Sequence, residues 1–87
     1  MNNHMIVNLK NFTLTHDIII LDGNQHVVER YTTSMKNMPE LVVDLCKRHN
    51  VSTISLMGNK SFSKKVGDNI QAINLAKYGL NFSIQYI

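Results

Sequence analysis

Two strand-like segments flank an Asp-Gly dipeptide in the first third of the chain. Residues 18–21 are four consecutive apolar residues, Asp22-Gly23 follows them, and residues 27–33 are again rich in β-branched side chains. Asp-Gly between two such segments is the strongest short-range signal for a β-hairpin, because both residues accept the backbone conformations of a tight turn. The sequence therefore predicts an antiparallel pair of strands, around which the other elements can be placed.

Alternating apolar and polar residues predict three more strands, at residues 5–9, 51–57 and 81–87. The strand that enters the hairpin is expected to begin near residue 16. Residues 12–15 either extend the first strand or lead into the second, and the pattern does not separate these alternatives. Five strands are therefore expected in all.

Apolar residues at helical spacing predict two helices. The first has Pro39 in its first turn, Asn37 as its cap and Asn50 as the left-handed residue that ends it. The second begins near Ser61 and ends at Gly79. Both boundaries thus have residues whose chemistry suits a helix end.

The predicted order of elements is β-β-β-α-β-α-β in a single small α/β (α+β) domain that covers residues 1–87. Right-handed crossovers place both helices on one face of a five-stranded mixed sheet. Gly67-Asp68 predicts a kink in the second helix, or its division into two pieces. On the uncovered face, Ser55 and Gln85 can meet water, but two helices cannot hide every side chain of residues 18–21. We therefore expect a second copy, as a homodimer, or another partner on that face.

Composition argues against several classes of protein. Cys46 is the only cysteine, so an intramolecular disulfide and a cysteine-based zinc site are excluded. The four histidines lack metal-ligand spacing, and we expect no metal and no cofactor. Cys46 lies three residues before His49, but a buried apolar role is favoured over a nucleophilic pair. No run approaches the ~20 apolar residues of a membrane span, and residues 1–5 do not resemble a signal peptide, so a cytoplasmic location is expected.

The turn into the second helix is a candidate anion-binding turn formed by Gly58, Asn59 and Ser61, with Lys60 beside it. It lacks the earlier glycine and the longer loop of a Walker motif. The alternative interpretation is structural: Ser61 caps the helix and Gly58 permits the turn.

Basic residues exceed acidic ones by nine to six, which gives a net charge of +3. Lys60, Lys64 and Lys65 form the densest cluster. Together with Lys47 and Arg48 they form a candidate patch for nucleic-acid phosphates or an acidic protein. The alternative is an ordinary solvated helix surface. Asp44 is expected to pair with Lys47 or Arg48 on its own helix.

A three-stranded antiparallel start followed by helix, strand, helix and strand resembles the ribonuclease H-like superfamily, which includes relatives that resolve Holliday junctions. The resemblance spans nearly the whole chain, as an order of elements only. It implies catalytic carboxylates on the first strand and at the end of the fourth, where two divalent ions would be held. This sequence has Asn8 and no acid within residues 5–9, and Met57-Gly58-Asn59 at the second position. Catalysis is therefore not expected.

The chain's short, asparagine-rich character also resembles small phage-encoded proteins, many of which bind host machinery. The expected function is a non-enzymatic protein-interaction module, such as a phage-encoded inhibitor of a host defence or nucleic-acid enzyme. Its contact surface would be the uncovered sheet face or the lysine-bearing helix. The alternative is direct nucleic-acid binding through the lysines of the second helix. A divergent nuclease or phosphate-handling enzyme is a third possibility.

Overall fold

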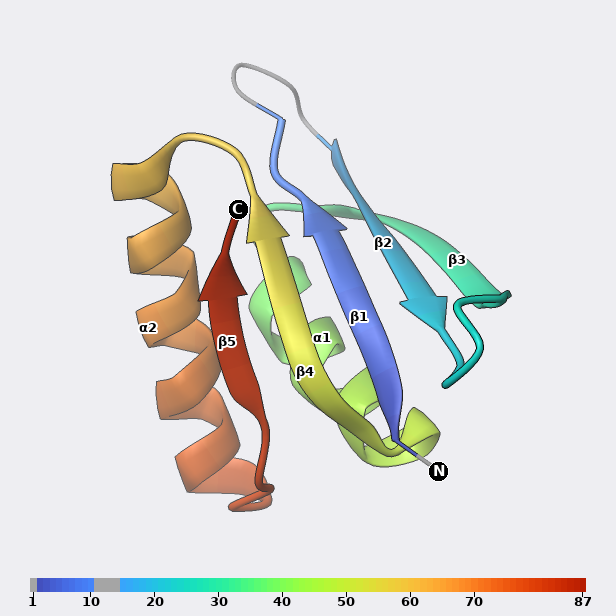
Figure 1. The fold of residues 1–87 in the computed structure, drawn as a ribbon. Coiled ribbons are helices and arrows are strands. Elements are labelled where there is room, and N and C mark those ends of the chain that lie inside the picture. The colour runs from blue at the N-terminus through green and yellow to red at the C-terminus, as the bar shows by residue number, and fades with distance from the viewer. Residues whose placement is uncertain (1, 11–14) are drawn as a thin grey trace.

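Five strands form one mixed sheet in the order β3-β2-β1-β4-β5, with two helices beside it (Figure 1). The computed structural model describes residues 2–10 and 15–87. The elements are β1 (Asn3–Asn8), β2 (Thr15–Leu21), β3 (Val27–Ser34), α1 (Met38–His49), β4 (Val51–Met57), α2 (Lys60–Lys77) and β5 (Ser83–Tyr86). The predicted fold class and order of elements are confirmed. Residues 12–14, whose placement the sequence left open, lie outside the described residues.

The pairing of strands divides the sheet into an antiparallel and a parallel half. β1 pairs antiparallel with β2, and β2 antiparallel with β3. On its other side β1 pairs parallel with β4, which in turn pairs parallel with β5. The carboxyl ends of β1, β4 and β5 therefore lie at one edge of the sheet, and α2 begins at that edge (Figure 1).

The predicted hairpin turn is present, and its geometry depends on Asp22. The carboxylate oxygen Oδ1 of Asp22 accepts hydrogen bonds from the amides of Asn24 (2.8 Å) and His26 (2.9 Å). These amides hold the pKa of Asp22 below its usual value, because they stabilise the charged form. The left-handed residue is Gln25, at φ 66°, so the loop is wider than a two-residue Asp-Gly turn.

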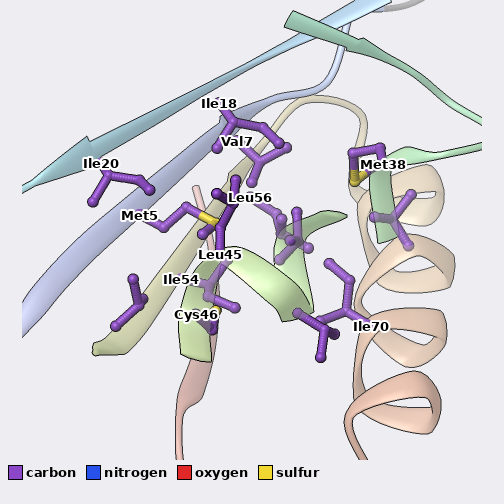
Figure 2. Close-up of a cluster of buried hydrophobic side chains, with 14 of the residues drawn as sticks. Met5, Val7, Ile18, Ile20, Met38, Leu45, Cys46, Ile54, Leu56 and Ile70 are labelled. Carbon is purple, nitrogen blue, oxygen red and sulfur yellow. The ribbon is translucent and has the colours of Figure 1, made fainter. Parts of the chain in front are cut away.

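One face of the sheet and both helices share a single apolar core (Figure 2). Alternate residues of the inner strands point into it, as the period of a β-strand requires. α1 contributes Val42, Leu45 and Cys46, and α2 contributes Val66 and Ile70. Because both helices contact this one core, they lie on the same face, as the right-handed crossovers predicted. None of the described helices combines the length and the apolarity that crossing a membrane requires.

The helix-free face is held by a row of polar contacts across three strands. The hydroxyl Oγ of Ser55 is hydrogen-bonded to His4 Nε2 (2.7 Å) and accepts from Gln85 Nε2 (2.6 Å). Ser55 is only 1% exposed, so it does not meet water as expected, because its strand neighbours cover it. Ile6 and Ile19 on this face are half-buried. The homodimer or partner expected to cover this face stays a prediction.

The predicted ends of the helices are only partly correct. Asn50 ends α1 at φ 53° as expected, whereas Asn37 holds the cap position without a side-chain cap hydrogen bond. The cap of α2 is Asn59 rather than Ser61, because Asn59 Oδ1 accepts from the amide of Phe62 (3.1 Å). Gly79 follows the end of α2 with φ +64°, as predicted for a terminating glycine.

α2 runs without interruption from Lys60 to Lys77, so the predicted division at Gly67-Asp68 is wrong. Gly67 has a packing role instead. A Cβ atom at this position would overlap the hydroxyl oxygen of Tyr86 on β5. The absence of a side chain therefore lets α2 approach the edge strand closely.

We expect Gly67→Ala to lower the free energy of unfolding, although helix propensity alone would raise it by about 1 kcal/mol. The overlap with Tyr86 should outweigh that gain, since overpacking typically costs about 1–3 kcal/mol. Urea unfolding measures the difference. In a Tyr86→Phe background, which lacks the nearest atom, the same substitution should cost less. A net stabilisation of the wild-type background by Gly67→Ala would show that the two elements have room to separate.

Candidate functional site

The carboxyl ends of the parallel strands and the amino end of α2 form one edge of the molecule (Figure 1). Ligands of open α/β sheets commonly bind outside the carboxyl ends of the strands. Gly58 connects β4 to α2 with φ +143°, and a Cβ atom there would lie 2.7 Å from the carbonyl oxygen of Leu9. Close backbone packing thus explains Gly58, whether or not a ligand binds.

The first turn of α2 has backbone donors without an acceptor among the residues that the structure describes. Asn59 accepts from the amides of Phe62, through its side chain, and of Ser63, through its carbonyl. Within the described part of the chain, no acceptor meets the amides of Lys60 and Ser61. α2 also has no acidic residue in its first turn, unlike α1, which has Glu40 there. The positive end of the α2 dipole is therefore not compensated by a carboxylate.

A cavity of about 290 Å³ lies beside this turn and is lined by Gly58, Lys60, Ser63, Tyr86 and Ile87. Ser63 is fully buried, and its hydroxyl has no hydrogen-bond partner within the described residues. The sequence pattern indicated Ser61, which is exposed, and not Ser63. The available signal was spacing: Ser63 and Gly67 are four residues apart, and this stripe of small residues is where α2 meets β5.

Lys60, Lys64 and Lys65 lie in the first two turns of α2 and are exposed, as the sequence predicted. Lys64 Nζ is 3.3 Å from Asp68 Oδ1, in a pair whose two side chains are 65% and 66% exposed. Such exposed pairs contribute little stability and exchange readily with other charged groups. The cluster is thus accessible to an anionic ligand.

Lys47 and Arg48 are in the last turn of α1, near the carboxyl end of α2, and line a shallow depression of about 550 Å³ with Asp44, Lys77 and Tyr78. An 18-residue helix is about 27 Å long at about 1.5 Å per residue, so the five predicted basic residues form two clusters rather than one patch. The nucleic-acid role of each cluster stays a prediction.

Beside Lys47 and Arg48, side chains of α1 and α2 form ion pairs and hydrogen bonds with each other. Lys77 Nζ lies 2.8 Å from Asp44 Oδ1 and 3.2 Å from Glu40 Oε1, and the Tyr78 hydroxyl donates to Asp44 at 2.8 Å. These contacts lower the pKa of Asp44, because Lys77 and Tyr78 stabilise its charged form. The expected pairing of Asp44 with Lys47 or Arg48 is therefore replaced by a contact from α1 to α2. Lys47 instead lies over the Tyr78 ring, 4.3 Å from its centroid.

The positions that would carry nuclease carboxylates are next to each other and do not suit a divalent metal. Asn8 at the end of β1 is paired in register with Met57 at the end of β4 and with Asp17 on β2. Asp17 is the only carboxylate of the three, and Lys10 Nζ lies 2.8 Å from it, which lowers its pKa. Within residues 2–10 and 15–87, no three His, Cys, Asp or Glu side chains gather to hold a metal ion.

His16 and Cys46 both have structural surroundings. His16 is buried on the core face, whereas Asp17 is on the other face of the sheet. His16 Nδ1 accepts a hydrogen bond from the backbone amide of Lys10 (3.0 Å). Burial raises the pKa of the Cys46 thiol to about 12, so it stays protonated and is a poor nucleophile.

No protein-family model matches the sequence, and no curated protein matches it. Among solved structures, the fold is similar to that of T. thermophilus RuvC in complex with a Holliday junction substrate, with a TM-score of 0.66 at 7% sequence identity. The likeness covers 100% of this chain and 64% of that chain, so this chain spans less than two thirds of its length. At this identity the likeness shows the fold alone, and the fold agrees with the ribonuclease H-like order of elements expected from the sequence.

The buried imidazole of His16 predicts a loss of stability on mild acidification. Burial lowers its pKa below the ordinary histidine value of 6.5, so the unfolded chain takes up a proton first as the pH falls through 6.5. The contribution of His16 to the free energy of unfolding is complete above that pH and declines below it. Urea unfolding at pH 7.5 and 5.5 should show the decline. His16→Asn, whose carbonyl can accept from the Lys10 amide, should show less of it, and an equal decline in both proteins would assign the effect to another group.

Proposed function

We propose that this chain is a non-enzymatic nucleic-acid-binding module that contacts phosphates with the amino end of α2. The observation that supports this most strongly is the coincidence of three exposed lysines with two unused backbone amides on the same turns. Ammonium groups and helix-start amides are the donors that nucleic-acid backbones recruit. The net charge of +3 favours the same class of ligand.

The choice of α2 over the Lys47 and Arg48 cluster follows from what each cluster already binds. Lys77, in the depression near Lys47, is engaged by two carboxylates from α1. A phosphate there would meet Asp44 and Glu40 at close range. In the first two turns of α2, the ion pair found among the described residues is that of Lys64 with Asp68, which is exposed. Phosphate contacts therefore meet less electrostatic repulsion at the α2 cluster.

Binding without cleavage is proposed because the carboxylate positions are altered. Two-metal phosphate chemistry needs acidic ligands around the scissile group. Asn8 and Met57 supply an amide and a thioether, and Asp17 is held by Lys10. The structurally similar RuvC was solved with a Holliday junction substrate, which supports nucleic acid as the class of ligand and leaves the form of the nucleic acid open.

A protein partner is the second candidate, and the edge strand β3 is the observation that favours it. β3 has eight residues, pairs with β2 on one side, and exposes Val27 and Val28 at 46% each. Such an edge can accept a strand from another protein. The phage-encoded inhibitor and the homodimer expected from the sequence would be narrower forms of this candidate.

The nucleic-acid proposal predicts salt-dependent binding that fails after charge reversal at one end of α2. Fluorescence anisotropy with single- and double-stranded oligonucleotides should show affinity that falls steeply with salt. Lys60→Glu with Lys65→Glu should weaken binding, and neutralising each lysine singly should reduce the salt slope by about 1.

The matched control is Lys47→Glu with Arg48→Glu. It changes the net charge by the same amount, but in the last turn of α1, near the carboxyl end of α2. This control should retain most of the affinity. Equal losses of affinity in the two double variants would show that binding depends on net charge and not on the position of the lysines. Absence of binding by the wild-type chain at low salt would contradict the proposal and favour the β3 edge and a protein partner.

A further inference from the structure

We propose that the cavity at the amino end of α2 is a binding site for a phosphate monoester group. The assignment of its source rests on the proposed function: if the chain binds nucleic acid, the source of that group is a terminal phosphate of an oligonucleotide. A free phosphate or a mononucleotide presents the same chemistry. The site consists of the α2 start, Lys60, Ser63 and the wall formed by Tyr86 and Ile87.

Ser63 is the first reason to assign a ligand to this cavity. A buried hydroxyl normally has a partner, because burial without a hydrogen bond costs free energy. Ser63 is 0% exposed, lines the cavity, and has no partner within the described residues. Alanine would fill the same space on the Gly67 stripe without this cost. The hydroxyl is therefore explained by an acceptor that arrives from outside the chain.

The start of α2 is the second and independent reason. Its amides at Lys60 and Ser61 lack acceptors within the described chain, and its first turn lacks a carboxylate. The positive end of a helix dipole attracts an anion, and the Lys60 ammonium adds a full charge beside it. Lys60 and Ser63 both line the cavity, so a residue with a backbone amide and an ammonium group and a residue with a hydroxyl border the same small space. Oxyanions with several terminal oxygens match that set.

The charge of the ligand favours a monoester over an internal diester. A volume of about 290 Å³ holds a phosphate with part of an attached sugar. A monoester carries about −1.5 to −2 charges at pH 7 and three terminal oxygens, whereas a diester carries one charge and two. The ring of Tyr86 and the side chain of Ile87 give the cavity an apolar wall that a sugar can contact.

The experiment compares oligonucleotides of one sequence that do or do not end in a phosphate, at the 5′ or the 3′ end. Fluorescence anisotropy should show several-fold tighter binding of one phosphorylated form by the wild-type chain. Ser63→Ala should abolish that preference and leave the affinity for the unphosphorylated oligonucleotide unchanged. Ser61→Ala is the matched control, because it removes a hydroxyl from the same turn that does not line the cavity.

A second arm uses inorganic phosphate and a mononucleotide, followed by amide chemical shifts in NMR spectra. Saturable shifts at Lys60, Ser61 and Ser63 that disappear in Ser63→Ala would support the site. If they occur without any preference for a phosphorylated oligonucleotide, the source of the group is free phosphate or a mononucleotide. Absence of both the shifts and the preference would overturn the inference.

Failure of this inference is distinguishable from failure of the proposed function. Affinity for the unphosphorylated oligonucleotide and its loss on reversal of Lys60 and Lys65 test nucleic-acid binding alone. Ser63→Ala should also unfold at the same or a higher urea concentration than the wild-type chain, because it removes an unpartnered buried hydroxyl. Clear destabilisation by Ser63→Ala would give the hydroxyl a structural role and overturn the assignment.

Discussion

The double pairing of β1 is the constraint on which the rest of the structure depends. β1 pairs with the antiparallel hairpin on one side and with the parallel β4 on the other, so it is the strand through which the two halves of the described sheet are hydrogen-bonded. Its inward side chains, Met5 and Val7, are fully buried against the helices. Because β4 and β5 follow the direction of β1, three strand ends and the start of α2 are brought to one edge. The candidate site is a consequence of that direction.

The sequence was sufficient to predict this architecture, because its signals are local and redundant. The Asp22 turn, the helix end at Asn50 and the alternation in β5 each depend on neighbouring residues only. Long-range contacts limited the details. Gly67 weakens a helix when considered alone, yet here it permits contact with Tyr86, nineteen positions further along the chain. Ser55 is buried by His4 and Gln85 from two other strands, which alternation along β4 could not indicate.

The sequence predicted the kind of site, a basic cluster at the start of α2, better than the residues that form it. Lys60, Lys64 and Lys65 are neighbours in sequence, so their proximity on α2 could be inferred from helical spacing. Their separation from Lys47 and Arg48 could not be inferred, because it depends on the direction in which α1 and α2 pack. The cap of α2 is Asn59 and not Ser61. Both residue types can cap a helix, and the backbone geometry decides between them. Spacing from Gly67 could place Ser63 on a stripe of small residues, but its position beside a cavity depends on Tyr86 and Ile87, which line the same cavity.

The two ends of α2 show how one helix can present lysines with different consequences. At the carboxyl end, Lys77 stabilises the negative end of the dipole and also binds Asp44 and Glu40, so its charge holds α1 and α2 together. At the amino end, Lys60 adds positive charge to the positive end of the dipole, where it opposes helix stability. No carboxylate of the first turn compensates for it. Such an arrangement is unfavourable in the free protein and becomes favourable when an anion binds between the lysine and the amides. The electrostatics of α2 therefore favour an anionic ligand at its amino end, next to the hydroxyl of Ser63, which has no hydrogen-bond partner among residues 2–10 and 15–87.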